Sequence, residues 1–486
     1  MTSALTIVPT PRVPRTFLGD DDRDLLAYLL GVIGRCHSRN EELSFAYDSK
    51  RLVKSLGMAI PSDFDALKTV CGWGGTVVDV LNERRMVDHL EVGDSAEFQE
   101  MVNKAWDDND MDAESPQFQA TEMVHGIGFC VVAQDPDDRD RVIILPTPAT
   151  RMTMEYDRAR RRGTAAASND EALRPGDPRQ ATLYQLEKTT VVELVGGRYR
   201  IVDEFANPSG VLPVERFVNR QRLDAQWGRS EITPAVLSYT DRAVRTMLSM
   251  EVARESFAMP KEFLLNVAQE AFQDADGNAA SAWDMFWTRF KALSGTLNED
   301  GELLGPEPDV KQLPASSPSS LIDMIKMDSQ LVAAETGIPP SNLGFVTENP
   351  PSGDGMRMYE NRLVKRAKMR NRVDGSAYGR VSRLVLLARG VPLNKLPTVR
   401  TVWVPEETST PAGDTDAITK QVTAGIIPPT SDVALEKLGY GREQIERIQV
   451  DRRRASGSAA LRSITQRVTA DQGQQQASVS NDNAAG

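Results

Sequence analysis

Residues that could do chemistry are few in this sequence and lie far apart. Gly72–Thr76 (Gly-Trp-Gly-Gly-Thr) has the glycine content of a phosphate-binding loop, but the Gly-Lys-Ser/Thr ending that reaches phosphate and metal is missing. We therefore interpret it as a turn that opens a helix. His37, His89 and His125 are isolated, and they lack the spacing of metal ligands and any accompanying G-x-S-x-G nucleophile motif. We expect no catalytic, metal-binding or cofactor-binding residues and no enzyme activity.

Two charged stretches are the other candidates for a ligand surface. Residues 261–313 are acidic, and the spacing of their acids matches no calcium-binding loop. Residues 362–372 are basic and carry Arg362, Lys365, Arg366, Lys368, Arg370 and Arg372. A nucleic-acid surface is one interpretation of this basic stretch. We favour a solvated face, or salt bridges that link the subunit to acidic neighbours, because runs of charge are usually solvated.

Composition narrows the class of protein. The 486 residues correspond to about three structural units, and 40% hydrophobic residues are enough for a sizeable core. The net charge of −12 disfavours a surface that grips DNA, although an acidic wall would let DNA pass without holding it. The three widely spaced cysteines indicate synthesis in a reducing compartment. Neither a signal peptide nor an apolar stretch of ~20 residues is seen, so we expect no contact with membranes.

The first half of the chain is predicted to form one α+β unit that extends to about Arg222. An amphipathic helix begins at Asp20, and further helices are predicted at 62–70, 76–88, 95–107 and 115–125. Alternating β-branched segments predict strands at 127–132, 141–145, 181–187, 190–194 and 198–202. Gly196-Gly197 is typical of a two-residue hairpin turn between the last two strands. The polar stretch 158–179 is predicted to be an exposed loop.

Long helices dominate the second half. Thr233 and Pro234 predict the start of a helix that runs to Ala258, and its apolar residues cover more than one side. A second helix is predicted from Ser320, with Asp323 completing a capping box, to Gly337. A third covers 354–389, with Gly375 and Gly379 inside it as points that could allow a bend or close packing. A strand at 398–404 and small helices at 414–424, 431–438 and 442–454 follow, before a low-complexity tail.

Several strings, in their order and spacing, resemble the portal proteins of tailed bacteriophages, in particular those of siphophages that infect actinobacteria. They are Tyr47-Asp48 with the downstream RLVKSLGMAIP, GWGGTVVDVLNERR at 72–85, WGRSEITPAV at 227–236, ETGIPPSNLGF at 335–345, NRLVKRAKMRNR at 361–372 and AGIIPPTSDVALEKLGYGREQIERI at 424–448. The resemblance covers roughly residues 20–454. No single string defines the family, but the set does.

The resemblance implies an α+β, mainly helical portal fold. Its parts would be a wing at 20–232, stem helices at 233–258 and 320–337, a clip at 259–319, a channel loop at 338–353, a long wing helix at 354–390, and a strand with crown helices at 391–454. Residues 1–19 and 455–486 would be disordered. Gly353-Asp354-Gly355 departs from the helix-friendly start expected after the loop, which makes the boundary between loop and helix less definite.

The resemblance also implies the function. The protein would be a portal subunit in a homo-oligomeric ring, a dodecamer, at the unique capsid vertex of the virion, after synthesis in the host cytoplasm. Double-stranded DNA would pass through without sequence specificity, and terminase, head–tail adaptor, major capsid and scaffold proteins would be partners. We expect the channel-loop residues Ser341, Asn342, Thr347, Asn349 and Ser352 to touch DNA. We expect the clip residues Glu262, Asp274, Asp284, Glu299 and Asp300 to contact the adaptor.

Two other classes stay open at this point. A phage nuclease or packaging ATPase would need a phosphate loop or acids gathered at strand ends, and we recognise neither in the sequence. A scaffold or other virion structural protein would be mostly extended coiled coil, which the predicted strands disfavour. A ring around DNA needs a head-to-tail contact that closes on itself, and helices that are apolar on two sides suit such a contact.

Overall fold

The computed structural model describes most of the chain. The described residues are 17–52, 69–258 (except 94, 136, 139, 171–178 and 225), 262–265, 306, 309–312, 318–345, 353–407, 411–441 and 443–455. Most of the predicted helix at 62–70 (residues 62–68) and the segments 1–16 and 456–486 lie outside them. The chain divides into two compact units, Met1–Glu406 and Glu407–Gly486.

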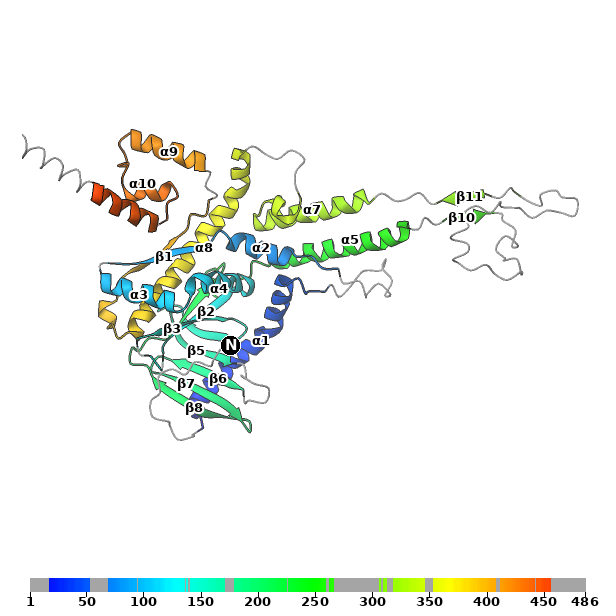
Figure 1. Ribbon diagram of the computed structural model, residues 1–486. Coiled ribbons are helices and arrows are strands. Elements are labelled where there is room, and N and C mark those ends of the chain that lie inside the picture. The colour runs from blue at the N-terminus through cyan, green and yellow to red at the C-terminus, as the bar shows by residue number, and fades with distance from the viewer. Residues whose placement is uncertain are drawn as a thin grey trace, which may run out of the picture. The chain divides into compact units, whose positions relative to one another are not determined.

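Two antiparallel sheets form the centre of the first unit (Figure 1). The larger sheet has the order β4-β5-β6-β7-β8, made of Met152–Asp157, Arg162–Asp170, Gln180–Gln185, Lys188–Val195 and Arg198–Ala206. The smaller has the order β3-β2-β9, made of Val142–Pro148, Ile127–Gln134 and Val214–Val218. Residues from both sheets share one apolar core, which includes Phe129, Met152 and Met154. Gly196 and Gly197 both have positive φ, which confirms the predicted hairpin turn.

Helix α1 (Asp20–Tyr47) packs along the larger sheet. Its buried Leu26 and Leu29 meet Leu183 and neighbouring residues of β5, β6 and β7, and this apolar contact fixes the helix on the sheet. Leu18 is buried in the same cluster, and its backbone N–H donates to Tyr199 O at 3.0 Å. Leu18, inside the segment 1–19 that the sequence analysis expected to be disordered, therefore contacts the larger sheet.

Several elements of this unit differ from those predicted from local sequence patterns. β5 lies within the predicted loop 158–179, because Ala165–Ala167 are buried despite the polar residues around them. β4 and β9 also have no counterpart among the predicted strands. Helix α2 covers only Trp73–Asn82, and the end of the predicted helix is instead strand β1 (Val87–Val92), paired antiparallel with the distant β12 (Val399–Trp403). A partner so far along the chain leaves no local signal.

The next two helices pack against the smaller sheet. Helix α3 (Ala96–Asp108) begins where predicted, with the Ser95 hydroxyl accepting from the Phe98 N–H at 3.3 Å. Helix α4 (Met111–His125) starts four residues earlier than expected, so Pro116 lies inside the helix and not at its first position. It ends at Gly126, whose φ of 90° is the left-handed geometry that glycine tolerates.

Three long helices follow, as predicted. α5 (Pro234–Ala258) and α7 (Ser319–Thr336) lie side by side (Figure 1). Strands β10 (Glu262–Leu265) and β11 (Asp309–Gln312), between them in the chain, pair antiparallel. The residue before α7 is Pro318 and Ser320 lies within the helix, so the predicted capping box does not form. Pro339 precedes a short 3-10 helix, η3 (Pro340–Leu343).

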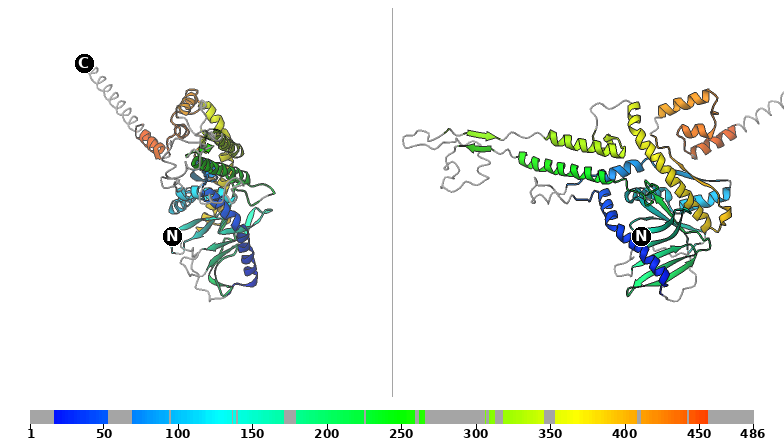
Figure 2. Two further views of the ribbon diagram at one scale, coloured as in Figure 1. Left: turned by 90° about the vertical axis from the view of Figure 1, so that its right-hand side faces the viewer. Right: turned by 180° about the vertical axis from the view of Figure 1, so that it is seen from behind.

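Helix α8 (Gly353–Ala388) runs diagonally across the first unit in front and rear views (Figures 1 and 2). It packs against β12, β9, β2 and α3, and its Tyr378 makes edge contacts with Phe217 and Trp106. The two internal glycines allow this approach. A Cβ at Gly379 would lie 2.9 Å from Val399 O, and one at Gly375 would lie 3.1 Å from Trp403 Nε1. The predicted close packing at both glycines is confirmed.

After α8, the 3-10 helix η4 (Leu393–Lys395) leads into β12, which belongs to the first unit. The second unit contains α9 (Pro411–Thr423), α10 (Asp432–Lys437) and helical residues 443–455. The Ser431 hydroxyl caps α10 by accepting from the Ala434 N–H at 3.2 Å. The structure thus places the strand in the first unit and the small helices in the second, whereas the sequence analysis grouped them together at 391–454.

Candidate functional site

Helix α8 is joined to the body by charged side chains that are completely buried. Arg85, in the turn after α2, is 0% exposed and forms an ion pair with Asp374 of α8. Its Nε also donates to Asn371 Oδ1 at 3.1 Å, and its Nη1 lies 3.4 Å from Met123 Sδ. A buried charge is tolerated only when paired and hydrogen-bonded, and Arg85 meets both conditions.

Glu122 of α4 is a second carboxyl group in this cluster and is also fully buried. Burial, and then the nearby charge of Asp374, raise the pKa of Glu122 well above its usual value, against the opposing effect of Arg85 and Arg370. Burial therefore favours the protonated form of Glu122 more than it would be favoured in an exposed glutamate. The carboxyl group that forms an ion pair with Arg85 is that of Asp374.

Glu231 forms a second buried centre, just before the start of α5. Its carboxylate forms ion pairs with Arg366 and, at 3.5 Å, with Arg370, both on α8. Arg220 approaches the same carboxylate at 3.5 Å. The backbone N–H of Glu231 donates to Met123 O at 2.9 Å, so one residue links α4, α5 and α8.

These contacts explain part of the basic stretch 362–372. Arg366 and Arg370 are bound within the chain, and Arg362 donates to backbone carbonyls at the end of α7, at 3.2 Å for Glu335 O. These ion pairs lie inside one subunit, which is neither the nucleic-acid surface nor the contact between subunits considered from the sequence. Lys365 and Arg372, by contrast, are exposed.

The sequence analysis did not single out Arg85, Glu122, Glu231 or Asp374. One signal was available for Asp374, which lies seven residues after buried Ala367 and seven before buried Val381. A charged residue in the apolar stripe of a helix indicates a buried partner, because an unpaired charge there would be costly. The other three residues lie in loops or on a helix without such a stripe.

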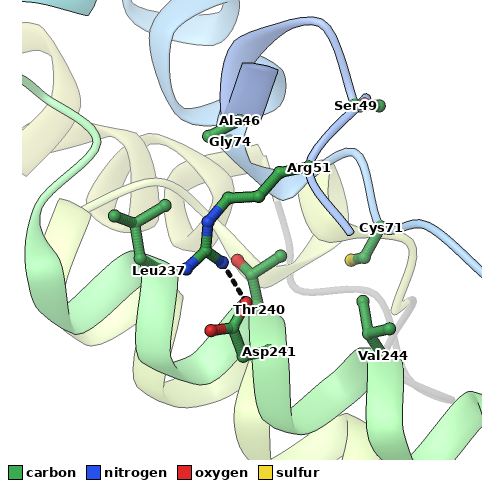
Figure 3. Close-up of a pocket in the computed structure, with 9 residues that line it drawn as sticks. All are labelled: Ala46, Ser49, Arg51, Cys71, Gly74, Leu237, Thr240, Asp241 and Val244. Atoms are coloured by element: carbon green, nitrogen blue, oxygen red, sulfur yellow. Dashed lines mark hydrogen bonds and ion pairs between the residues drawn. The ribbon is translucent and has the colours of Figure 1, made fainter. Parts of the chain in front are cut away.

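A small hollow lies where α1 ends beside the first turns of α5 (Figure 3). Its walls include Ala46, Ser49, Cys71, Gly74, Leu237, Thr240 and Val244. The ion pair between Arg51 and Asp241 crosses it. Next to it, the Tyr47 hydroxyl donates to Asp79 Oδ1 at 2.8 Å. The first contact attaches the start of α5 to the segment after α1, and the second joins α1 to α2. The side chains leave little room for a ligand.

The α5–α7 pair has its own buried charge. Asp328 of α7 is 2% exposed and pairs with Arg242 of α5 at 2.7 Å, beside buried Val332 and Thr336. Met324 and Met327 of α7 are 56% and 58% exposed. Each precedes a buried-face position by one residue, or about 100° around the helix. α7 therefore keeps an apolar side that α5 does not cover.

The expected DNA-contacting residues are only partly described. Ser341 and Asn342 are exposed on η3, which is fixed by buried Leu343 and followed by Gly344 in the left-handed region. Thr347, Asn349 and Ser352 lie outside the described residues.

Of the five residues expected to contact the adaptor, only Glu262 lies within the described residues. Glu262 is on β10, opposite Gln312 of β11. Asp274, Asp284, Glu299 and Asp300 lie outside the described residues.

In the described parts of the chain, no three His, Cys, Asp or Glu residues gather closely enough to hold a metal ion. No described helix is long and apolar enough to cross a membrane.

Comparison with known proteins identifies the family. The family model described as "Phage portal protein, SPP1 Gp6-like" matches residues 35–458. The chain belongs to this family of phage portal proteins, which confirms the identification made from the sequence. The portal proteins of Mycobacterium phages L5 and D29 are each 28% identical, over 420 and 417 residues, and cover 83% and 82% of this chain and 82% and 83% of their own length.

A solved structure is also similar, more weakly. A chain from the virion of a native gene transfer agent particle aligns with a TM-score of 0.41 and 14% identity, over 75% of this chain and 89% of its own. The fold of the present chain is mixed helix and sheet. As a phage portal subunit it is a structural component of the virion, in a family that forms multimeric rings with capsid and tail partners.

Proposed function

We propose that twelve copies of this portal subunit form the ring at the unique capsid vertex, and that double-stranded DNA passes through it during packaging and ejection. The main support for this proposal is the α5–α7 pair. It offers two long helices, held together by the Arg242–Asp328 ion pair, with an apolar side on α7 left free for a neighbouring copy. A rigid pair of this kind suits the wall of a channel.

The parts of the chain take the roles that the family resemblance suggests. In this proposal α5 and α7 are the stem, the segment 259–319 with β10 and β11 is the clip, and 338–353 is the channel loop. Residues 20–232 and α8 form the wing. The small helices after Glu406 form the crown, without β12.

Sliding DNA needs weak wall contacts that do not depend on sequence. Ser341 and Asn342 are neutral, exposed and fixed on η3, between the stem and α8. Polar groups of this kind touch phosphates without the counterion release that makes Lys and Arg contacts strong. We therefore assign DNA contact to this loop, together with Thr347, Asn349 and Ser352.

The remaining roles concern partners. The acidic clip, with Glu262, Asp274, Asp284, Glu299 and Asp300, would bind the head–tail adaptor and the terminase. Major capsid and scaffold proteins would contact the ring from the capsid side. The role is structural and needs no cofactor or catalysis, and the subunit is made in the host cytoplasm before it enters the virion.

Two experiments test the proposal. Negative-stain microscopy and native mass spectrometry of the purified protein should show closed annular particles of twelve copies. Deletion of residues 341–352 should abolish DNA packaging in phage-infected cells and leave the annular particles intact. Packaging at the normal level by the deletion variant would refute the role of the loop, and purified protein that forms no annular particles would refute the ring.

A further inference from the structure

Two charged surfaces of the first unit are mostly exposed in the described part of the chain. One is the outward face of α8, here called the basic face, which carries Lys365, Met369, Arg372, Val373 and Arg383. The other is the acidic corner, formed by Asp107, Asp108, Asp110, Asp112, Glu114, Asp137, Asp138 and Asp140. We propose that the basic face of one subunit binds the acidic corner of the next subunit in the ring, an inference that rests on the proposed ring.

The basic face is one continuous side of the helix. Lys365, Arg372 and Arg383 are spaced by seven and eleven residues, which places them within about 20° of one another around α8. All three are exposed, and within the described residues none forms an ion pair. The neighbouring Arg380, in contrast, is paired with Glu215 at 2.9 Å.

Apolar side chains interrupt this charged face. Met369 is 70% exposed and Val373 is 42% exposed, both among the three cations. A face that only meets water has no need of large apolar groups, whereas methionine and arginine are enriched where proteins meet. The combination therefore indicates a protein partner with negative charge.

The acidic corner is built from two turns held together. Asn109, between α3 and α4, donates to Val142 O at 2.7 Å and accepts from the Ile144 N–H at 2.9 Å. These bonds fix the α3–α4 turn against the hairpin of β2 and β3. The acids of both turns are exposed, and among them Asp140 pairs with Arg389 at 3.2 Å.

The same chain carries both surfaces on different sides of α8. Arg389, which pairs with Asp140 of the acidic corner, lies just after the last residue of α8 and six residues after Arg383 of the basic face. Its N–H still donates to Val385 O at 3.0 Å, so the helical rotation continues to this residue and places the two side chains about 120° apart. A ring requires this arrangement, because each subunit must present two different, complementary surfaces to its two neighbours.

A second copy fits the basic face better than DNA does. A subunit that used this face for DNA would leave the acidic corner unexplained. Copy-to-copy contact satisfies both surfaces at once, and also covers Met369 and Val373. Opposite charges at such a contact favour the correct register between neighbours.

Charge reversal in the full-length protein tests the contact. The variants are Lys365→Glu/Arg372→Glu on the basic face, Asp137→Lys/Asp138→Lys on the acidic corner, and the combination of all four. Arg35→Glu/Arg158→Glu, at exposed positions on α1 and beyond β4, is the control with the same charge change as the basic-face variant. The readout is the protein concentration at which half of the chains are in rings, measured by mass photometry, with circular dichroism to check folding.

Each double variant should raise this concentration by about tenfold or more, which corresponds to about 1.4 kcal/mol, and the four-residue variant should recover most of the loss. The control should assemble like the wild type. Wild-type rings together with unchanged assembly of both double variants would overturn this contact while leaving the ring itself in place. Normal rings that retain less DNA after Lys365→Glu/Arg372→Glu would assign the face to DNA and also overturn it. A wild type that never forms rings would instead overturn the proposed function.

Discussion

Replacing Arg85 with methionine should destabilise the first unit strongly. Methionine keeps an unbranched apolar side chain but removes the guanidinium group. Asp374, itself completely buried, then loses its ion pair, and Asn371 loses the donor at 3.1 Å. Removing one partner of a buried ion pair costs about 3–5 kcal/mol, because the other charge is left without compensation.

The matched double variant separates the ion pair from simple packing. Arg85→Met with Asp374→Leu removes both charges and leaves two apolar side chains of similar size. Such replacements are often neutral, or stabilising by about 1–4 kcal/mol. We therefore expect the double variant to be more stable than Arg85→Met alone, by about 3 kcal/mol or more.

Urea unfolding of the unassembled chain, followed by tryptophan fluorescence, measures both effects. Trp403 lies 5.9 Å from the Arg85 guanidinium, and Trp403 and Trp106 both contact Tyr378, so their emission reports on this core. The reasoning is refuted if Arg85→Met costs less than about 1 kcal/mol. It is also refuted if the double variant is no more stable than the single one.

Three further predictions concern other parts of the chain. Burial, and then the charge of Arg39, lower the pKa of His125 to about 4; the unfolded chain therefore takes up the proton first, and stability should fall by about 3 kcal/mol as pH drops from 6.5 to 4. His125→Gln should remove that slope in unfolding measured at several pH values, and an unchanged slope would contradict the assignment. Gly379→Ala should cost about 1–3 kcal/mol in urea unfolding, because the new methyl group meets the backbone of β12. Gly34→Ala on α1, with no atom within 4 Å, should stabilise by up to about 1 kcal/mol, and equal effects of the two would show that propensity alone decides. Ser341→Lys/Asn342→Lys should slow packaging by adding phosphate contacts, whereas Gln117→Lys, exposed on α4, should not; equal packaging rates would argue against DNA contact at η3.

The long helices could be predicted because their ends are marked locally. The Thr233 hydroxyl accepts from the Val236 N–H at 3.3 Å at the start of α5, and Gly337 ends α7 with a φ of 73°. The pairing of β1 with β12 could not be predicted, since both are short and lie more than 300 residues apart. β5 was missed because its buried residues are alanines, which do not favour strands.

The candidate site, too, could be predicted from the sequence only in part. The position of Ser341 and Asn342 between two helices follows from the prolines and glycines around them. The buried pairs of Arg85 and Glu231 depend on residues that meet only in the folded chain. Charge alone gave no means of telling Arg366, which is bound inside the subunit, from exposed Lys365 one position before it.

The contact at Glu231 has a mechanical consequence. Arg362, Arg366 and Arg370 follow one another at intervals of four residues, so they lie along one side of α8, about one helical turn apart. Glu231 pairs with Arg366 and Arg370. If α8 slid along its axis by about 6 Å, Glu231 would exchange Arg370 for Arg362, but Asp374 would be drawn away from buried Arg85. The two buried pairs together therefore hold α8 at a single position along its axis.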